Sequence, residues 1–144
     1  MKELEIFTDG ACSGNPGEAA IGFVINENNQ RIKEFSKSIG KATNNIAEYT
    51  ALIYALQEAL ILKADVIKVF TDSELMHRQI IGQYKVKNEN IKLLFDQVKN
   101  LMKGFKKVHV THVPREQNKD ADRLASSVLK AKQTKMAAST LRDE

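Results

Sequence analysis

The amino-acid sequence predicts one α/β domain that opens with an antiparallel run of strands and continues with alternating strands and helices. Two observations lead to this prediction. Apolar residues alternate with polar ones near the start, whereas from Asn45 they recur every three or four residues. The length of 144 residues, of which 42% are hydrophobic and 28% charged, suits a single domain with its own core. The expected order of elements is βββαβααβα.

Three strands are expected in the first forty residues. Glutamates alternate with Leu4 and Ile6 before a turn begins, which is typical of a strand with one buried face. Residues 19–25 are apolar enough for a second strand, and residues 31–39 predict a less regular third. The Asn-Glu-Asn-Asn segment at 26–29 has the composition of a hairpin connection, so the three strands should form an antiparallel meander.

The middle of the chain predicts alternating helices and strands. A helix of about five turns begins at Asn45, and the short apolar run at 66–70 predicts a strand covered on both faces in a parallel sheet. A second helix should follow Asp72, and the apolar spacing at 89–103 predicts a third. Residues 108–113 predict a fifth strand.

The last predicted helix sets the expected domain boundary. Asn118 can cap this helix after a loop at residues 114–117. From Lys132 the apolar period fades into small and charged residues. We therefore expect the domain to cover residues 1–131 and residues 132–144 to form a frayed or disordered tail.

Composition excludes several classes of protein. No apolar run approaches the roughly 20 residues of a membrane helix, and the start lacks the apolar stretch of a secretory signal. The single Cys12 cannot form an internal disulfide or a multi-cysteine zinc site. We expect a cytoplasmic monomer with no membrane and no obligatory protein partner. The net charge of +4 suits a polyanionic partner but does not by itself indicate one.

Four acidic residues stand where predicted strands end or predicted helices begin, and these are Asp9, Glu48, Asp72 and Asp122. Each has an ordinary explanation as a turn residue, a helix cap or a favourable charge at a helix N-terminus. Asn45 and Glu48, for example, have the spacing of a capping box. In an open α/β sheet, however, ligands gather at such ends, so the four carboxylates can converge in one cleft.

Four converging carboxylates would need compensating positive charge. Two carboxylates 4 Å apart repel each other by roughly 1 kcal/mol in water and by about 4 kcal/mol at an intermediate effective dielectric. Mg²⁺ prefers oxygen ligands, and a pair of such ions can clamp the attacking and leaving oxygens of a phosphodiester. No cluster of histidines or cysteines in the sequence favours another metal.

Four sequence motifs, in this order, resemble those of the type 1 ribonuclease H family. They span nearly the whole predicted fold and are TDGACSGNPG at residues 8–17, TNNIAE at 43–48, FTDS at 70–73 and NKDADRLA at 118–125. The resemblance implies a ribonuclease H-like fold with a five-stranded mixed sheet in the order 3-2-1-4-5 and helices on both sides. It also implies an endonuclease that cuts the RNA strand of RNA/DNA hybrids.

The resemblance further implies a pair of Mg²⁺ ions, with Mn²⁺ as a possible substitute. Asp9 would bridge both ions. Glu48 and Asp72 would hold the ion facing the leaving 3′ oxygen, and Asp122 would hold the ion that activates water. The products would carry 5′-phosphate and 3′-hydroxyl ends.

Substrate contacts are also implied, directed largely at the 2′-hydroxyl that separates RNA from DNA. The expected substrate-binding residues are Gly10, Cys12, Thr43, Asn44, Asn45 and Ser73, of which Thr43 would contact a phosphate of the DNA strand. The glycines at 10–17 would permit close approach of an RNA backbone, or simply form a hairpin. His112 stands where the family often has a mobile histidine that assists proton transfer or product release; the alternative is an exposed strand residue without a role in the reaction.

Two departures from the family pattern leave other functions open. Residues 83–88 lead directly into the next helix without the basic insertion of some relatives, and Glu74 replaces a neutral amide near the RNA. Both favour, as an alternative, a nucleic-acid-binding module of the same fold that does not hydrolyse its ligand. A third reading is a small-ligand-binding α/β protein whose acidic residues only cap helices.

Overall fold

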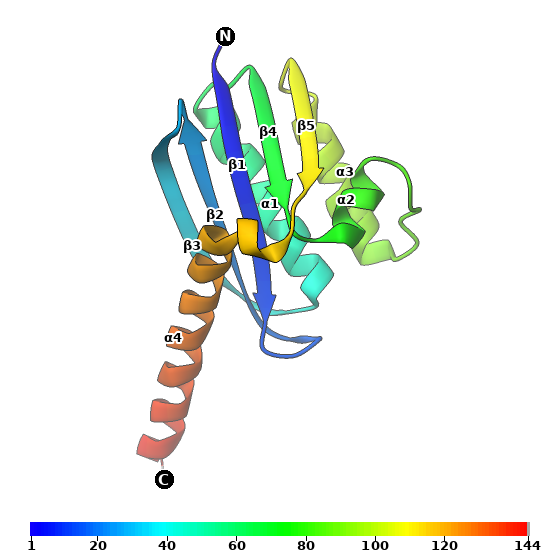
Figure 1. The fold of residues 1–144 in the computed structure, drawn as a ribbon. Coiled ribbons are helices and arrows are strands. Elements are labelled where there is room, and N and C mark those ends of the chain that lie inside the picture. Colours follow the sequence, from blue (N-terminus) through cyan, green and yellow to red (C-terminus); the bar gives the residue numbers. More distant parts are fainter. Residues whose placement is uncertain (144) are drawn as a thin grey trace.

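The structure, a computed structural model, describes the backbone of residues 1–143 and the side chains of residues 1–138. It confirms the predicted order of strands and helices (Figure 1). The strands are β1 (Glu3–Cys12), β2 (Gly17–Glu27), β3 (Gln30–Ala42), β4 (Val66–Thr71) and β5 (Lys107–His112). The helices are α1 (Asn44–Ile61), α2 (Glu74–Ile80), α3 (Glu89–Met102) and α4 (Lys119–Asp143), with a short 3₁₀ turn at Arg115–Gln117.

The five strands form one mixed sheet in the predicted order β3-β2-β1-β4-β5. β2 is antiparallel to both β1 and β3, whereas β4 is parallel to both β1 and β5. Asn28 and Asn29 connect β2 to β3 with φ angles of 52° and 63°, the left-handed conformation that a two-residue hairpin requires. The first three strands are longer than predicted, because ladder hydrogen bonds continue past the apolar alternation.

Helices cover both faces of the sheet, as predicted. α1, with α3 beside it, packs on one face, and α4 crosses β1, β2 and β3 on the other (Figure 1). The main core lies between the sheet and α1. Its largest fully buried side chains include Tyr49, Phe23, Leu4 and Ile6.

Two glycines allow both layers of helices to touch the sheet. A Cβ atom on Gly10 would lie 2.5 Å from the carbonyl carbon of Ala47 in α1. A Cβ atom on Gly22 would lie 2.6 Å from the carbonyl oxygen of Ala121 in α4. At Gly10 the sequence suggested close approach of an RNA backbone, but the nearest backbone is that of α1.

The helix caps differ from the sequence prediction. α1 begins one residue before Asn45, and the Thr43 hydroxyl accepts the Ile46 N–H at 3.2 Å. The capping box predicted from Asn45 is therefore wrong. Similarly, the Ser73 hydroxyl accepts the N–H of Met76 and caps α2, so Asp72 does not. Neither Glu48 nor Asp72 is therefore used as a helix cap.

Asn118 also differs from its predicted role as a side-chain cap. Its carbonyl accepts the N–H of Asp122 and so starts α4, but its side-chain amide donates to the carbonyl of Thr8 at 2.8 Å. This hydrogen bond ties the start of α4 to β1, because the amide group is buried and faces the strand.

α4 continues beyond the boundary predicted at residue 131. The backbone is helical through Asp143, and Figure 1 shows the helix running past the end of the sheet. The Lys132 ammonium lies 3.1 Å from the Glu18 carboxylate at the start of β2. The predicted frayed tail is thus helical over 132–143, whereas Glu144 and the side chains from residue 139 lie outside the described part of the chain. Among the described residues, no helix is long and apolar enough to cross a membrane.

Candidate active site

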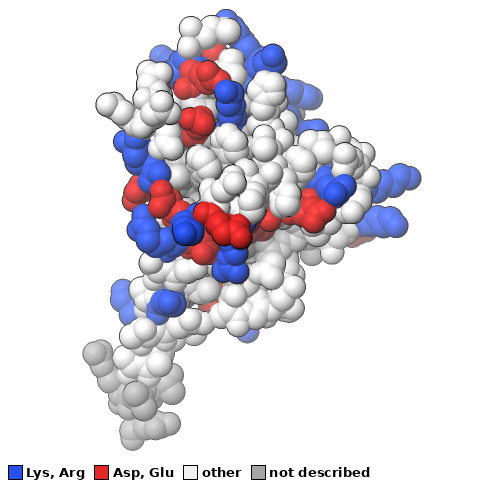
Figure 2. Space-filling model, in the orientation of Figure 1, with Lys and Arg blue, Asp and Glu red and all other residues white. Residues whose placement is uncertain are grey.

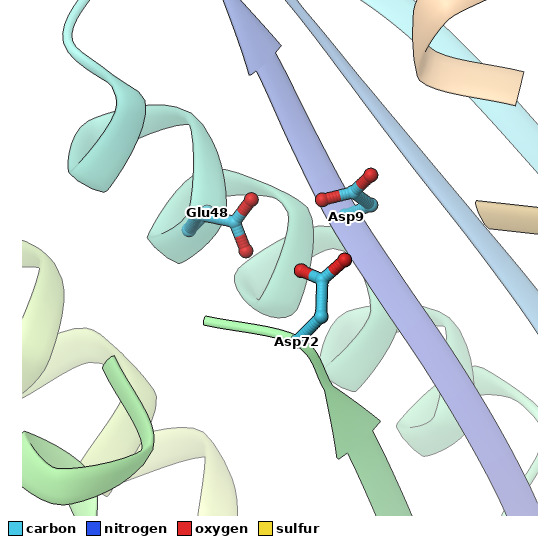
Figure 3. Close-up of side chains that lie close together, drawn as sticks. All are labelled: Asp9, Glu48 and Asp72. Atoms are coloured by element: carbon cyan, nitrogen blue, oxygen red, sulfur yellow. The ribbon is translucent and has the colours of Figure 1, made fainter. Parts of the chain in front are cut away.

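Three of the four predicted acidic residues meet at one point. Asp9 comes from β1, Glu48 from α1 and Asp72 from the residue that follows β4, and Figure 3 shows their carboxylates directed toward one another. One carboxylate oxygen from each lies within 4.8 Å of the others. Asp9 and Glu48 are only 5% and 8% exposed, so this is a partly enclosed site rather than a surface cluster.

The register of the sheet explains why these residues meet. β1 and β4 are parallel neighbours, and Thr8 pairs with Thr71. The next residues, Asp9 and Asp72, therefore lie side by side at the same edge of the sheet. The Gly10 N–H donates to the Glu48 carboxylate at 2.9 Å and to that of Asp9 at 3.0 Å, so one backbone group orients two of the acids.

Asp122 completes the site from the opposite layer. It lies in the first turn of α4, lines the same cleft as Asp9, and contributes to raising the pKa of Asp9. It is not part of the three-residue group around Glu48. Both Glu48 of α1 and Asp122 of α4 therefore act on Asp9.

All four acids line one open cleft of about 700 Å³. The other lining residues come from the β1–β2 hairpin, the start of α1, the 3₁₀ turn and α4, and are Gly10, Ala11, Cys12, Ser13, Asn44, Arg115, Ser126, Leu129, Lys130 and Gln133. Figure 2 shows acidic side chains in a band across the middle of this face of the molecule.

Burial makes these acids difficult to ionise together. Desolvation, followed by the charge of Glu48, raises the pKa of Asp9 to about 10. Desolvation raises the pKa of Glu48 to about 7, although the neighbouring Asp9 side chain and the hydrogen bond from the Gly10 N–H oppose the shift. Burial also raises the pKa of Asp72, partly offset by a hydrogen bond from Asn118. The site therefore favours either bound protons or bound cations.

One atom points specifically to a cation. The Oε2 atom of Glu48 is buried and has no hydrogen-bond partner among the described residues. A buried carboxylate oxygen without a partner is costly unless it coordinates a metal ion. Oxygen ligands at this density suit a hard divalent cation such as Mg²⁺. The four carboxylates thus fit the metal site that the sequence predicts.

The predicted substrate-binding residues divide into two groups. Gly10, Cys12 and Asn44 line the cleft. Thr43, Asn45 and Ser73 do not line it, and the hydroxyls of Thr43 and Ser73 cap α1 and α2. The Cys12 thiol donates to the carbonyl of Ala42 at 3.2 Å, and burial together with the Glu48 charge raises its pKa. Cys12 is therefore a neutral hydrogen-bonding side chain here rather than a reactive thiolate.

His112 is the last residue of β5 and is exposed. It pairs with Thr71, the residue before Asp72, which places its backbone next to the acidic site. Its ring lies 6.0 Å from that of His77 between centroids, and neither histidine lines the cleft.

Sequence reasoning missed two basic residues that line the cleft. The Arg115 guanidinium lies 3.9 Å from the Asp122 carboxylate. Lys130 follows Asp122 by eight residues, and that spacing on one helix is the signal by which it could have been found. Neither Arg115 nor Lys130 belongs to a sequence motif that would indicate a function.

The chain was compared with known protein families and with known sequences. The sequence model of a family described as reverse transcriptase-like matches residues 7–128. Ribonuclease HI of Halobacterium salinarum is 39% identical over 127 residues, which are 88% of this chain and 64% of that protein. A bifunctional protein of Mycobacterium tuberculosis is 38% identical over 138 residues, 94% of this chain, and the chain spans only 38% of its length.

Solved structures show the same relationship. The N-terminal RNase H domain of the Mycobacterium tuberculosis protein superposes with a TM-score of 0.91 at 36% identity, covering 94% of this chain and 99% of that one. LC11-RNase H1, solved in complex with an RNA/DNA hybrid, superposes with a TM-score of 0.85 at 37% identity, covering 90% and 99%.

Proposed function

The chain belongs to the reverse transcriptase-like family of ribonuclease H domains, and from this we propose that it is an endonuclease that hydrolyses the RNA strand of RNA/DNA hybrids. The observation that carries the proposal is the convergence of Asp9, Glu48 and Asp72 within 4.8 Å, beside Asp122, in an open cleft. A relative that binds such a hybrid, LC11-RNase H1, supports the substrate class. The products would carry 5′-phosphate and 3′-hydroxyl ends.

We propose that the four carboxylates hold two Mg²⁺ ions, for which Mn²⁺ would be a possible substitute. Glu48 and Asp72 would hold one ion, Asp122 the other, and Asp9 both. The effect of both Glu48 and Asp122 on the pKa of Asp9 supports this division, as does the unpartnered Oε2 atom of Glu48. Bound ions of this kind supply Lewis acidity and positive charge at the scissile phosphodiester.

The chain's own residues would orient the carboxylates and bind the substrate. The Gly10 N–H holds Glu48 and Asp9, and Asn118 holds Asp72. The cleft residues Cys12 and Asn44 are the contacts best placed to reach the RNA strand. In this proposal Gly10, Thr43, Asn45 and Ser73 also contact the hybrid, with Thr43 on the DNA strand, and His112 assists proton transfer or product release.

A cleavage assay tests the proposal directly. A hybrid labelled on its RNA strand, double-stranded RNA and a DNA duplex with a single ribonucleotide should be incubated with the protein and Mg²⁺. We expect cleavage of the hybrid, none of double-stranded RNA, and loss of activity by at least about 10³-fold in Asp72→Asn. Undiminished cleavage by Asp72→Asn would refute the assignment of the site.

The same assay separates the second candidate, a nucleic-acid-binding module without hydrolysis. Glu74 favours this candidate, because its carboxylate, paired with the Arg78 guanidinium at 2.9 Å, stands where the family resemblance implies a neutral amide. Binding of the hybrid without turnover in either Mg²⁺ or Mn²⁺ would establish it in place of the nuclease.

A further inference from the structure

The cleft extends beyond the acidic residues along α4. Asp122, Ser126, Lys130 and Gln133 follow one another at intervals of three or four residues, and all four line the cleft. Such spacing places side chains on one face of a helix. With a rise of about 1.5 Å per residue, Lys130 lies about 12 Å along the helix from Asp122. The same face of α4 therefore runs from the candidate active centre to a basic side chain.

The opposite side of this part of the cleft is the β1–β2 hairpin. Its lining residues are Ala11, Cys12 and Ser13. The Ser13 N–H donates to the Glu18 carbonyl at 2.8 Å, and the Glu18 carboxylate lies 3.1 Å from the Lys132 ammonium. Because this ion pair joins the hairpin to α4, the two sides of the cleft are held at a defined separation.

The charges along α4 suit a polyanion. Lys130 is exposed, and no carboxylate of the described residues lies within 4.0 Å of its ammonium group. No Asp or Glu occurs between Asp122 and Asp143, whereas Lys130, Lys132 and Lys135 all fall in that interval. Figure 2 shows basic side chains on α4 below the acidic band. An unpaired cation next to an acidic centre attracts phosphate where that centre alone would repel it.

We propose that Ser126, Lys130 and Gln133 of α4 form a phosphate-binding wall for the RNA strand of the hybrid. This inference rests on the proposed function, from which the RNA/DNA hybrid is taken as the ligand. The separation of about 12 Å places the Lys130 contact on the RNA backbone away from the scissile bond. Lys130 binds a backbone phosphate, and Gln133 donates a hydrogen bond to the same stretch of backbone.

Substitution of Lys130 tests the wall. In Lys130→Gln we expect the KM for the hybrid to rise about fivefold to tenfold with kcat unchanged, because the contact is remote from the reacting bond. The dependence of hybrid binding on salt should also weaken, with the slope of log K against log salt reduced by about 1. Lys130→Arg should restore both quantities, since it keeps the positive charge.

Lys135→Gln is the matched control, because it removes the same charge from the same helix at a residue that does not line the cleft. Binding is measured by fluorescence anisotropy with Mg²⁺ in an Asp72→Asn background, so that the hybrid stays intact. Equal effects of Lys130→Gln and Lys135→Gln would overturn the wall while leaving the nuclease proposal untouched. A wild-type protein that fails to cleave, but binds hybrid in a Lys130-dependent manner, would overturn the nuclease proposal alone.

Discussion

Glu48 shows how a single residue can be both part of the fold and part of the site. One of its carboxylate oxygens accepts the Gly10 N–H, and the other is buried with no partner among the described residues. The first oxygen fixes the side chain against β1, where α1 touches the strand at Gly10. In the proposed function, the second oxygen is thereby held in place to coordinate a cation before any cation binds.

Asp9 should make the metal-free protein sensitive to pH. Its folded-state pKa of about 10 lies above its ordinary value of 3.8, so the folded protein retains a proton that the unfolded chain releases. The stability from this group is complete below pH 4 and is lost as the pH rises toward 10. Asp9→Asn cannot ionise, so without divalent metal the excess of its Tm over that of the wild type should be small at pH 5 and should widen by several degrees at pH 9.

Thermal denaturation in EDTA at pH 5, 7 and 9 measures this difference. Asp120→Asn is the control, and its effect on Tm should have the opposite sign. A hydrogen bond from Arg31 lowers the pKa of Asp120, so replacing this carboxylate removes a stabilising interaction. A constant gap between wild type and Asp9→Asn across the pH range would contradict the buried charge assigned to Asp9.

His112 should affect the rate more than binding. If it assists proton transfer, His112→Ala should lower kcat by about 10²-fold with little change in KM. Steady-state kinetics on the hybrid provides the measurement. His77→Ala is the matched control, because its ring lies beside that of His112 but the proposed function gives it no role in the reaction. Equal kcat values for wild type and His112→Ala would remove the histidine from the reaction.

At the scale of elements, the contact between α4 and β2 positions Asp122. The helix lies against the strand at Gly22, next to Ala121, and the Asn118 amide anchors the start of the helix to β1. Asp122 follows directly in the chain. A small displacement of this helix would therefore move one carboxylate away from the other three.

Gly22→Ala should reduce both stability and activity. The new Cβ would lie 2.6 Å from the Ala121 carbonyl oxygen, a backbone atom that cannot rotate away. Overpacking of this kind costs about 1–3 kcal/mol, which corresponds to a fall in Tm of roughly 2–10 °C, and kcat should fall as Asp122 shifts. Chemical denaturation and the hybrid assay measure the two effects.

Gly104→Ala controls for the substitution itself. Its Cβ would also lie 2.6 Å from a neighbour, but that neighbour is the flexible end of the Leu60 side chain. The variant should therefore lose less stability and keep its activity. If both variants behaved alike, the rigid contact between α4 and β2 would not be what positions Asp122.

At the scale of the whole molecule, the acids come from both layers and from the strands between them. β1 and β4 supply the central pair, α1 supplies Glu48 from one face of the sheet, and α4 supplies Asp122 from the other (Figure 1). The site thus joins parts of the chain more than 100 residues apart. A cation bound there should stabilise the entire fold.

Divalent metal should accordingly raise the unfolding temperature. A ligand at 100 times its Kd that binds only the folded state stabilises it by about 2.7 kcal/mol, or roughly 5–10 °C for a domain of this size. Differential scanning fluorimetry with Mg²⁺, against NaCl at equal ionic strength, measures the shift. The double variant Asp9→Asn, Glu48→Gln should lose it. A wild-type Tm indifferent to Mg²⁺ would instead favour a protein whose acids have no metal to bind.

Local patterns in the chain were sufficient for the type and order of the elements and for the positions of the four acids. Apolar residues recur at every second position before Asn45 and at every third or fourth position after it. This change can be recognised in the sequence without knowing any contact between distant segments. The four motifs then indicated the family, the strand order and the acids as one set. Their joint role in metal binding and catalysis remains a prediction.

The distances in the site could be determined only from the tertiary structure, because they depend on contacts between segments that are remote in sequence. Asp9 and Asp72 meet through the register of β1 with β4, and Lys130 reaches the cleft because α4 crosses β2 at Gly22. The caps show the same limit: Asn45 had suitable chemistry and spacing, yet Thr43 makes the hydrogen bond. Several nearby residues can satisfy a local rule, and long-range packing selects among them.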